Sequence, residues 1–143
     1  MALVLIVDDE QVVRQVLMRW LKQTDHEIHE ADSADAALQF LERQPAAVVF
    51  SDIQMPGHDG MWLTMEIRKR YPSTAVVLAT AVSTIPPRFS MQAGVLAYLI
   101  KPFDRQAVLD GLATALDWHQ KAVATRPQVM PLDELQAWLD NLV

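Results

Sequence analysis

Short apolar runs recur along the chain and are separated by longer segments of mixed polarity. Runs that stay apolar without alternation, and that are rich in β-branched residues, are typical of strands buried on both faces of a sheet. Together with a shorter, more polar strand candidate at 27–31, they predict five strands. The apolar runs cover residues 3–7, 47–50, 75–79 and 97–100.

The segments between the strands carry apolar residues three and four apart, which is the spacing of an amphipathic helix. Ser33 is expected to cap a helix that ends before Pro45, and Asp59 is expected to cap one that ends before Pro72. Helices are predicted over residues 10–22, between Ser33 and Pro45, over 60–71 and over 104–121.

The segment between the fourth and fifth strands contains the pair Pro86-Pro87. Proline breaks the interior of a helix but is tolerated in its first turn. We therefore predict a short helix that begins near Pro86, in place of a full crossover helix.

Alternating strands and helices predict an α/β fold, a doubly wound (βα)5 domain with a five-stranded parallel sheet and right-handed crossovers. This domain is expected to cover residues 1–121, followed by a linker over 122–130. Residues 131–143 predict a short acidic amphipathic helix. Such a helix needs a docking surface, which could be its own domain, another chain or an output domain that it begins.

Composition narrows the class of protein. The 143 residues suffice for one domain with a core, and no apolar run approaches the roughly 18 residues of a membrane span. The absence of cysteine excludes disulfides and thiolate metal sites, and the net charge of −6 disfavours nucleic acid as the main partner. The apolar start is too short for a signal peptide, so a cytoplasmic location is expected.

Residues with chemical potential follow the predicted strands. Asp8 and Asp9 follow the first strand, Asp52 the third, Thr80 the fourth and Lys101 the fifth. Ligands of parallel sheets bind beyond the carboxyl ends of the strands, so these side chains should meet at one edge. Clustered carboxylates repel one another and suit a hard cation such as Mg²⁺. A carboxylate left free to attack phosphorus, with a lysine and a hydroxyl for the phosphoryl oxygens, would suit phosphoryl transfer.

The motifs VLIVDDE, SDIQMPGHDG, LATA and YLIKPF, in this order, resemble the receiver domain of two-component response regulators. The resemblance covers residues 3 to about 120 and implies a flavodoxin-like sheet with strand order 2-1-3-4-5. It implies that Asp52 accepts a phosphoryl group from a histidine kinase or a phosphotransfer protein. It also implies that Asp8 and Asp9 hold Mg²⁺, with Asp9 as the direct ligand.

Further roles follow from the same resemblance. The backbone carbonyl of Gln54 matches a metal ligand, and Lys101 matches the lysine that contacts the phosphoryl group. Thr80 and Tyr98 match the hydroxyl and the aromatic side chain that switch on activation, and the Lys101-Pro102 bond is expected to be cis. The output face would consist of the fourth helix, the fifth strand and the fifth helix, and would bind a downstream partner or a fused output domain. A homodimer is a further partner that we consider.

Other interpretations stay open. Asp8 and Asp9 could simply cap the first helix, and His58 could be an ordinary exposed loop residue or could tune access of a phosphodonor. A metal-dependent phosphatase with an aspartyl-phosphate intermediate needs an acid two residues after its nucleophile, where this chain has Gln54. A receiver-like module that is never phosphorylated would not need the complete set. We expect self-phosphorylation and dephosphorylation rather than enzymatic turnover, and no contact with membrane or nucleic acid.

Overall fold

The computed structural model describes residues 1–80 and 95–124 of the chain. Five strands form one parallel sheet with the order β2-β1-β3-β4-β5, so the predicted α/β sheet and its strand order are confirmed. The strands are β1 (Leu3–Val7), β2 (Glu27–Ala31), β3 (Val48–Asp52), β4 (Ala75–Thr80) and β5 (Val95–Ile100).

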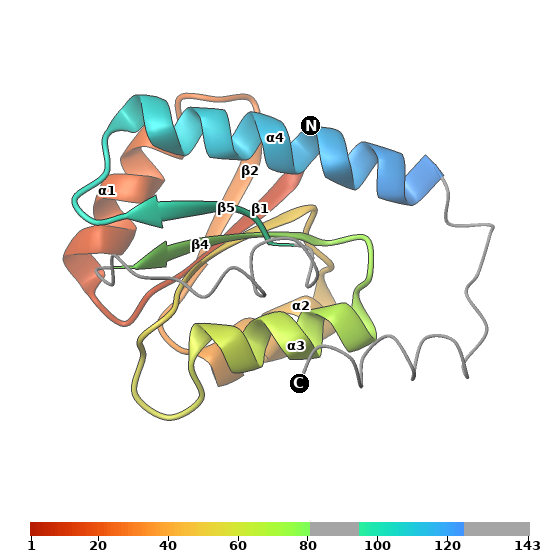
Figure 1. Cartoon of the computed structure of the whole chain (residues 1–143), viewed down its shortest axis with the longest axis horizontal. Coiled ribbons are helices and arrows are strands. Elements are labelled where there is room, and N and C mark those ends of the chain that lie inside the picture. The colour runs from red at the N-terminus through yellow and green to blue at the C-terminus, as the bar shows by residue number, and fades with distance from the viewer. Residues whose placement is uncertain (81–94, 125–143) are drawn as a thin grey trace.

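Among the described residues, two pairs of helices cover the two faces of the sheet, as can be followed in Figure 1. Because side chains alternate along a strand, Val4 and Ile6 pack on one face and Leu5 and Val7 on the other. The first face is covered by α1 and α4, and the second by α2 and α3. The helices are α1 (Gln11–Leu21), α2 (Ala34–Arg43), α3 (Gly60–Arg70) and α4 (Arg105–Ala124).

The predicted helix caps are present. The Ser33 side chain accepts a hydrogen bond from the amide of Ala36 at the start of α2, and the Asp59 side chain accepts one from the amide of Trp62 at the start of α3. Each cap satisfies a backbone donor that the helix itself leaves without a partner. The entry of the chain into α2 and α3 is thus encoded locally.

Three boundaries differ by two residues or more from those predicted. β3 continues through Asp52, because the parallel pairing with β4 extends to Asp52 beside Ala79. β5 begins at Val95, earlier than predicted. α4 continues to Ala124, so residues 122–124 of the predicted linker are helical; they include two alanines, which favour helix, and no proline.

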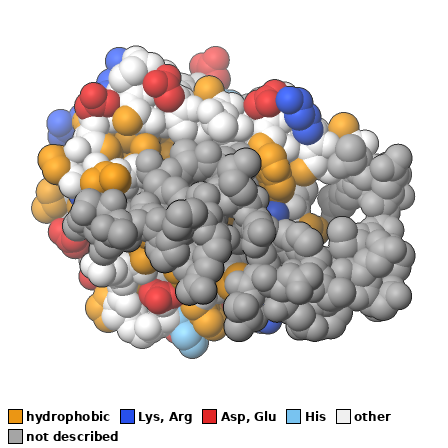
Figure 2. Space-filling model, viewed as in Figure 1, with side chains coloured by type: hydrophobic (Ala, Val, Ile, Leu, Met, Phe, Trp, Pro, Cys, Tyr) orange, Lys and Arg blue, Asp and Glu red, His pale blue; other side chains and the backbone are white. Residues whose placement is uncertain are grey.

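Other predicted segments lie outside the described residues: the short helix near Pro86, the rest of the linker and the helix at 131–143. Among the helices that the structure describes, none combines the length and the apolarity that a membrane span requires. Acidic and basic side chains are interspersed on the described surface in Figure 2, which shows no large region of one sign there.

A buried arginine connects the end of α3 to α4, near the point where β4 begins. Arg68 is only 5% exposed, and its guanidinium donates hydrogen bonds to the carbonyls of Pro72, at 2.9 Å, and Thr74. The same group lies over the ring of Trp118, 5.1 Å from its centroid. Burial lowers the pKa of Arg68 to about 10, which leaves it charged at neutral pH. Within the described part of the chain its Nε has no hydrogen-bond partner.

We predict that Arg68→Ala lowers the free energy of unfolding by about 2–4 kcal/mol, because two carbonyls lose a charged donor and a cavity forms. Arg68→Lys should recover only part of the loss, since an ammonium lacks the planar fork that serves both carbonyls and Trp118. Urea unfolding measures both. Arg70→Ala is the matched control: this exposed arginine forms surface ion pairs with Glu42 and Glu66, so the loss should stay below about 1 kcal/mol. Equal losses for the two alanine variants would contradict the role of Arg68.

Candidate functional site

Four neighbouring strands end at the same edge of the sheet. Asp8 directly follows β1, Asp52 is the last residue of β3, and Lys101 directly follows β5. The register aligns Val7 with Ser51 and Leu78, and Thr80, two residues after Leu78, pairs with Ile100, so these strands end close to one another. The carboxyl ends of these strands therefore lie together, as predicted.

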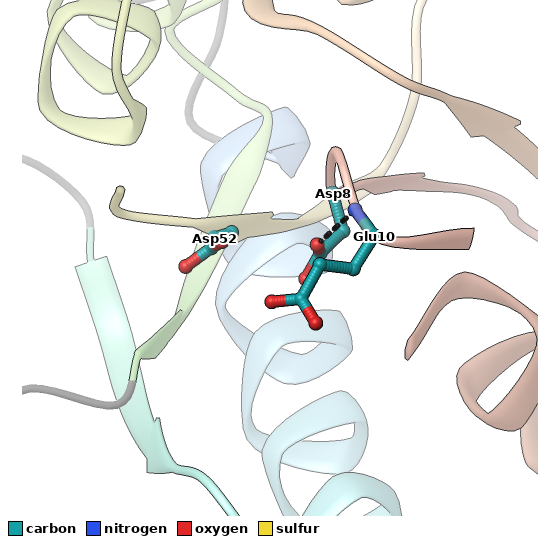
Figure 3. A group of neighbouring side chains, drawn as sticks. All are labelled: Asp8, Glu10 and Asp52. Atoms are coloured by element: carbon teal, nitrogen blue, oxygen red, sulfur yellow. Dashed lines mark hydrogen bonds between the residues drawn. The ribbon is translucent and has the colours of Figure 1, made fainter. Parts of the chain in front are cut away.

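Three carboxylates converge at this edge, as Figure 3 shows. Oxygens of Asp8, Glu10 and Asp52 all lie within 4.8 Å of one another. Asp8 and Asp52 are 1% and 5% exposed, whereas Glu10 lies on the solvent side. The backbone amide of Glu10 donates to Asp8 Oδ1 at 2.9 Å, and this turn after β1 brings the Glu10 side chain back toward Asp52.

One ammonium group lies among the three carboxylates. Lys101 Nζ is 3.1 Å from Asp8 Oδ2, 3.5 Å from Asp52 Oδ2 and 3.8 Å from Glu10 Oε1. The Lys101-Pro102 peptide bond that follows β5 is cis. Among the described side chains, the site therefore holds three carboxylates against one ammonium, and two of the carboxylates, Asp8 and Asp52, are buried.

The pKa shifts express this imbalance. Burial raises the pKa of Asp52; the Lys101 charge opposes the rise, the Asp8 carboxylate adds to it, and a hydrogen bond from the amide of Gln54 opposes it. Burial alone would lower the pKa of Lys101, but its hydrogen bond to Asp8 and the neighbouring carboxylate charges outweigh burial and raise it. Lys101 is thus held as a cation, while Asp52 stays short of compensating positive charge.

The structure brings together three residues predicted for the site, namely Asp8, Asp52 and Lys101. The side chain of Asp9 is exposed and is not one of the three clustered carboxylates. Gln54 lies beside Asp52, and its amide donates to Asp52 Oδ1 at 3.3 Å. Its carbonyl as a metal ligand stays a prediction.

Of the two predicted switch residues, the structure describes only the backbone. Thr80 and Tyr98 belong to β4 and β5, but their side chains lie outside what the structure describes. Glu10, in contrast, was missed by the sequence analysis. Its signal is the third acid of the VDDE motif, which belongs to the site only because the chain turns after Asp8.

The chemistry of the cluster suits one class of ligand. All donors that converge here are carboxylate oxygens, the ligands of hard divalent cations such as Mg²⁺. Asp8, Glu10 and Asp52 are the described side chains that could hold such an ion. The net negative charge that remains beside Lys101 is a physical reason for it to bind.

Glycine is required where α3 passes the end of β3. The amide of Gly60 donates to the carbonyl of Ile53 at 2.8 Å, and a Cβ at Gly60 would lie 2.1 Å from the carbonyl oxygen of Asp52. Gly57 differs, because it has a φ of 77° and nothing within 4 Å of a Cβ. Gly60 thus allows the close backbone contact that fixes the end of β3, and Gly57 allows a left-handed turn.

We predict that Gly60→Ala costs about 2–4 kcal/mol of unfolding free energy, because the new methyl group would displace the backbone at Asp52. Gly57→Ala is the control and should cost about 1 kcal/mol, the penalty for a side chain in the left-handed region. Thermal or urea unfolding measures the difference. A Gly60→Ala variant as stable as Gly57→Ala would contradict the tight packing at β3.

We predict that Asp52→Asn stabilises the fold at neutral pH. Since the pKa of Asp52 is raised in the folded state, folding binds protons, and the wild-type chain loses stability as pH rises from about 4 through the folded-state pKa. Asparagine lacks this titration, so its advantage should grow over that interval and then stay constant. Urea unfolding at several pH values measures it. Asp25→Asn, at an exposed site, is the matched control for the loss of one carboxylate. A less stable Asp52→Asn at neutral pH would contradict the prediction.

The chain is similar to known proteins in sequence and in fold. The response regulator receiver domain family matches residues 4–113. Response regulator protein FleR of Pseudomonas aeruginosa is 42% identical over 113 residues, which are 78% of this chain and 24% of FleR. Transcriptional regulatory protein GlrR of Escherichia coli K12 is 31% identical over 140 residues, 91% of this chain and 32% of GlrR.

A solved structure shows the same relationship. The signal receiver domain of an HD domain-containing protein from Pseudomonas fluorescens Pf-5 superposes with a TM-score of 0.77 at 31% identity, and the match covers 83% of this chain and 97% of that one. The chain spans about a quarter of the length of FleR and about a third of that of GlrR. The chain therefore belongs to the response regulator receiver domain family, whose members act in two-component phosphorelay signalling.

Proposed function

We propose that Asp52 accepts a phosphoryl group from a phosphohistidine on a sensor histidine kinase or a phosphotransfer protein. The position of Asp52 supports this most. Asp52 is nearly buried, is the last residue of the central strand β3 and has its Oδ2 3.5 Å from Lys101 Nζ. A carboxylate in this setting is rigidly oriented, and a cation lies beside it for the incoming phosphoryl oxygens.

The proposed transfer is a displacement at phosphorus. An oxygen of Asp52 attacks phosphorus as the P–N bond of the phosphohistidine breaks, and the bonding electron pair returns to the imidazole nitrogen of the donor. Lys101, freed in part from Asp8, can donate to the phosphoryl oxygens. The charge of a bound Mg²⁺ would offset the repulsion between the carboxylates and the phosphoryl group. We propose Asp8, Glu10 and Asp52 as its side-chain ligands, with Asp9 and the Gln54 carbonyl as the ligands that the resemblance implies.

The same geometry makes two other functions less favourable. A phosphatase with an aspartyl-phosphate intermediate needs an acid where this chain has Gln54, whose side chain is exposed. A module used only for contacts has no need for a nearly buried, charge-imbalanced site, which costs folding free energy. We therefore propose that the chain catalyses its own phosphorylation and dephosphorylation and turns over no external substrate.

The output is also part of the proposal. We propose that phosphorylation, through Thr80 and Tyr98, changes the predicted output face, of which the structure describes β5 and α4, the helix predicted as the fifth. That face would bind a downstream partner, a fused output domain or a second copy of the chain. GlrR is named a transcriptional regulatory protein and is about three times as long as the matched region, which favours a fused output domain. We expect this to take place in the cytoplasm.

We predict that a small acyl phosphate and Mg²⁺ add one phosphoryl group to the chain, measured as intact mass. Asp52→Asn should abolish the adduct, and a chelator should do the same to the wild type. Lys101→Ala should slow the reaction by about 10²–10³-fold, because the charge on the phosphoryl oxygens loses its partner. Asp25→Asn, away from the site, should react like the wild type.

The same assay separates the candidate metal ligands. Glu10→Gln should raise the Mg²⁺ concentration needed for the half-maximal rate at least as much as Asp9→Asn does, because Glu10 and not Asp9 belongs to the carboxylate cluster. An unchanged adduct in Asp52→Asn would contradict the assignment of the nucleophile. Sustained release of phosphate from an organic ester would favour the phosphatase instead.

A further inference from the structure

The loop between β3 and α3, residues 53–59, carries a histidine with two partners from different helices. His58 Nδ1 lies 2.9 Å from Asp35 Oδ1, which belongs to α2. The ring of His58 is stacked on that of Trp62 in α3, with centroids 3.7 Å apart and planes 7° from parallel. The side chain therefore contacts both helices that cover this face of the sheet.

The rest of the loop shows what His58 adds. At its start the amide of Gln54 donates to Asp52 Oδ1, and Met55 is buried in the core. Between Met55 and His58 the chain passes through exposed Pro56 and Gly57. The first half of the loop is thus fixed by Met55, and the second half is tied to the domain by His58 and by the α3 cap that follows it.

We propose that His58 is a positioning residue for phosphoryl transfer at Asp52. By holding the second half of the loop against Asp35 and Trp62, it restricts Pro56 and Gly57, which follow buried Met55, and holds them away from the path of the phosphodonor to Asp52. This inference rests on the proposed function. Its physical basis is preorganisation: a loop that is ordered before the reaction loses less conformational entropy during transfer.

The contacts also give the clamp formed by His58, Asp35 and Trp62 a dependence on protonation. Asp35 faces the imidazole from α2, Trp62 faces it from α3, and the neighbouring Asp59 carboxylate already accepts from the Trp62 amide at 2.8 Å. Protonation of His58 would add a charge-assisted hydrogen bond to Asp35 and a cation–π contact with Trp62. Histidine is the side chain whose charge changes most readily near neutral pH. The clamp should therefore be tighter when the imidazole is charged.

Both partners of the pair are more than half exposed, at 51% for the His58 side chain and 64% for that of Asp35. An exposed ion pair of this kind contributes little to global stability. The loss of His58 should therefore change the reaction at Asp52 much more than the unfolding of the domain. This contrast distinguishes a positioning role from a structural one.

The test compares rates of adduct formation with an acyl phosphate at saturating Mg²⁺, at pH of about 5.5 and 7.5. We expect His58→Ala to react about 3–10-fold more slowly than the wild type at the lower pH and to differ less at the higher pH. His58→Phe, which keeps the stack without the pair, should recover part of the rate. Asp35→Asn keeps a hydrogen-bond acceptor at position 35 without its charge. In this background, the effect of His58→Ala on the rate should be similar at the two pH values.

His29→Ala is the matched control, because His29 also contacts an aromatic ring, Phe40, and a carboxylate, Glu27, but lies on β2 away from the loop. It should react at the wild-type rate. A His58→Ala variant that matches the wild type at both pH values would overturn the positioning role. Absence of any adduct in the wild type would instead overturn the proposed function, and the positioning role with it.

Discussion

The contact between the Lys101 ammonium and three carboxylates is the interaction on which the arrangement of the site depends. Lys101 comes from the end of β5, whereas Asp8 and Asp52 come from β1 and β3, and β4 lies between β3 and β5. The ammonium reaches Asp8 across 93 positions of sequence. The strand order β2-β1-β3-β4-β5 is what brings these charges together at one end of the sheet.

Holding that cluster has a cost that the core must offset. Burial raises the pKa of Asp52 and the Asp8 carboxylate adds to it, so the ionised site opposes folding. β1 and β3 counter this with side chains buried on both faces, among them Leu5, Ile6 and Phe50. Each fully buried side chain of this size contributes about 1.5–3 kcal/mol. The site is thus a small destabilised region on a rigid support, as functional sites often are.

Much of this architecture was predictable from the sequence, because each part has a local cause. Strands buried on both faces leave unbroken apolar runs, and the caps at Ser33 and Asp59 are short-range hydrogen bonds. The meeting of Asp8, Asp52 and Lys101 followed from the rule that parallel strands end at one edge. The strand order itself did not follow from the pattern; it came from the resemblance to receiver domains.

The features that were missed depend on the tertiary structure. Arg68 belongs to a basic run that suits a helix terminus, and nothing in its spacing distinguishes it from the exposed Arg70. Its burial follows from the turn at Pro72 and from the approach of Trp118. Glu10 enters the site because the chain turns after Asp8, a geometry that strand alternation does not predict.

The distances around Lys101 also suggest how a charge added at Asp52 would be felt elsewhere. The ammonium is now closer to Asp8 than to Asp52, at 3.1 Å against 3.5 Å. On the proposed function, a phosphoryl group on Asp52 brings further negative charge and strong acceptor oxygens to this point. Lys101 would then move toward Asp52, and it directly follows Ile100, which pairs with Thr80. On this proposal, the added charge would act on β5 through the side chain of Lys101, and Thr80 of β4 lies beside Ile100, the residue before Lys101. A response of β4 and β5 would therefore need no long chain of intermediate residues.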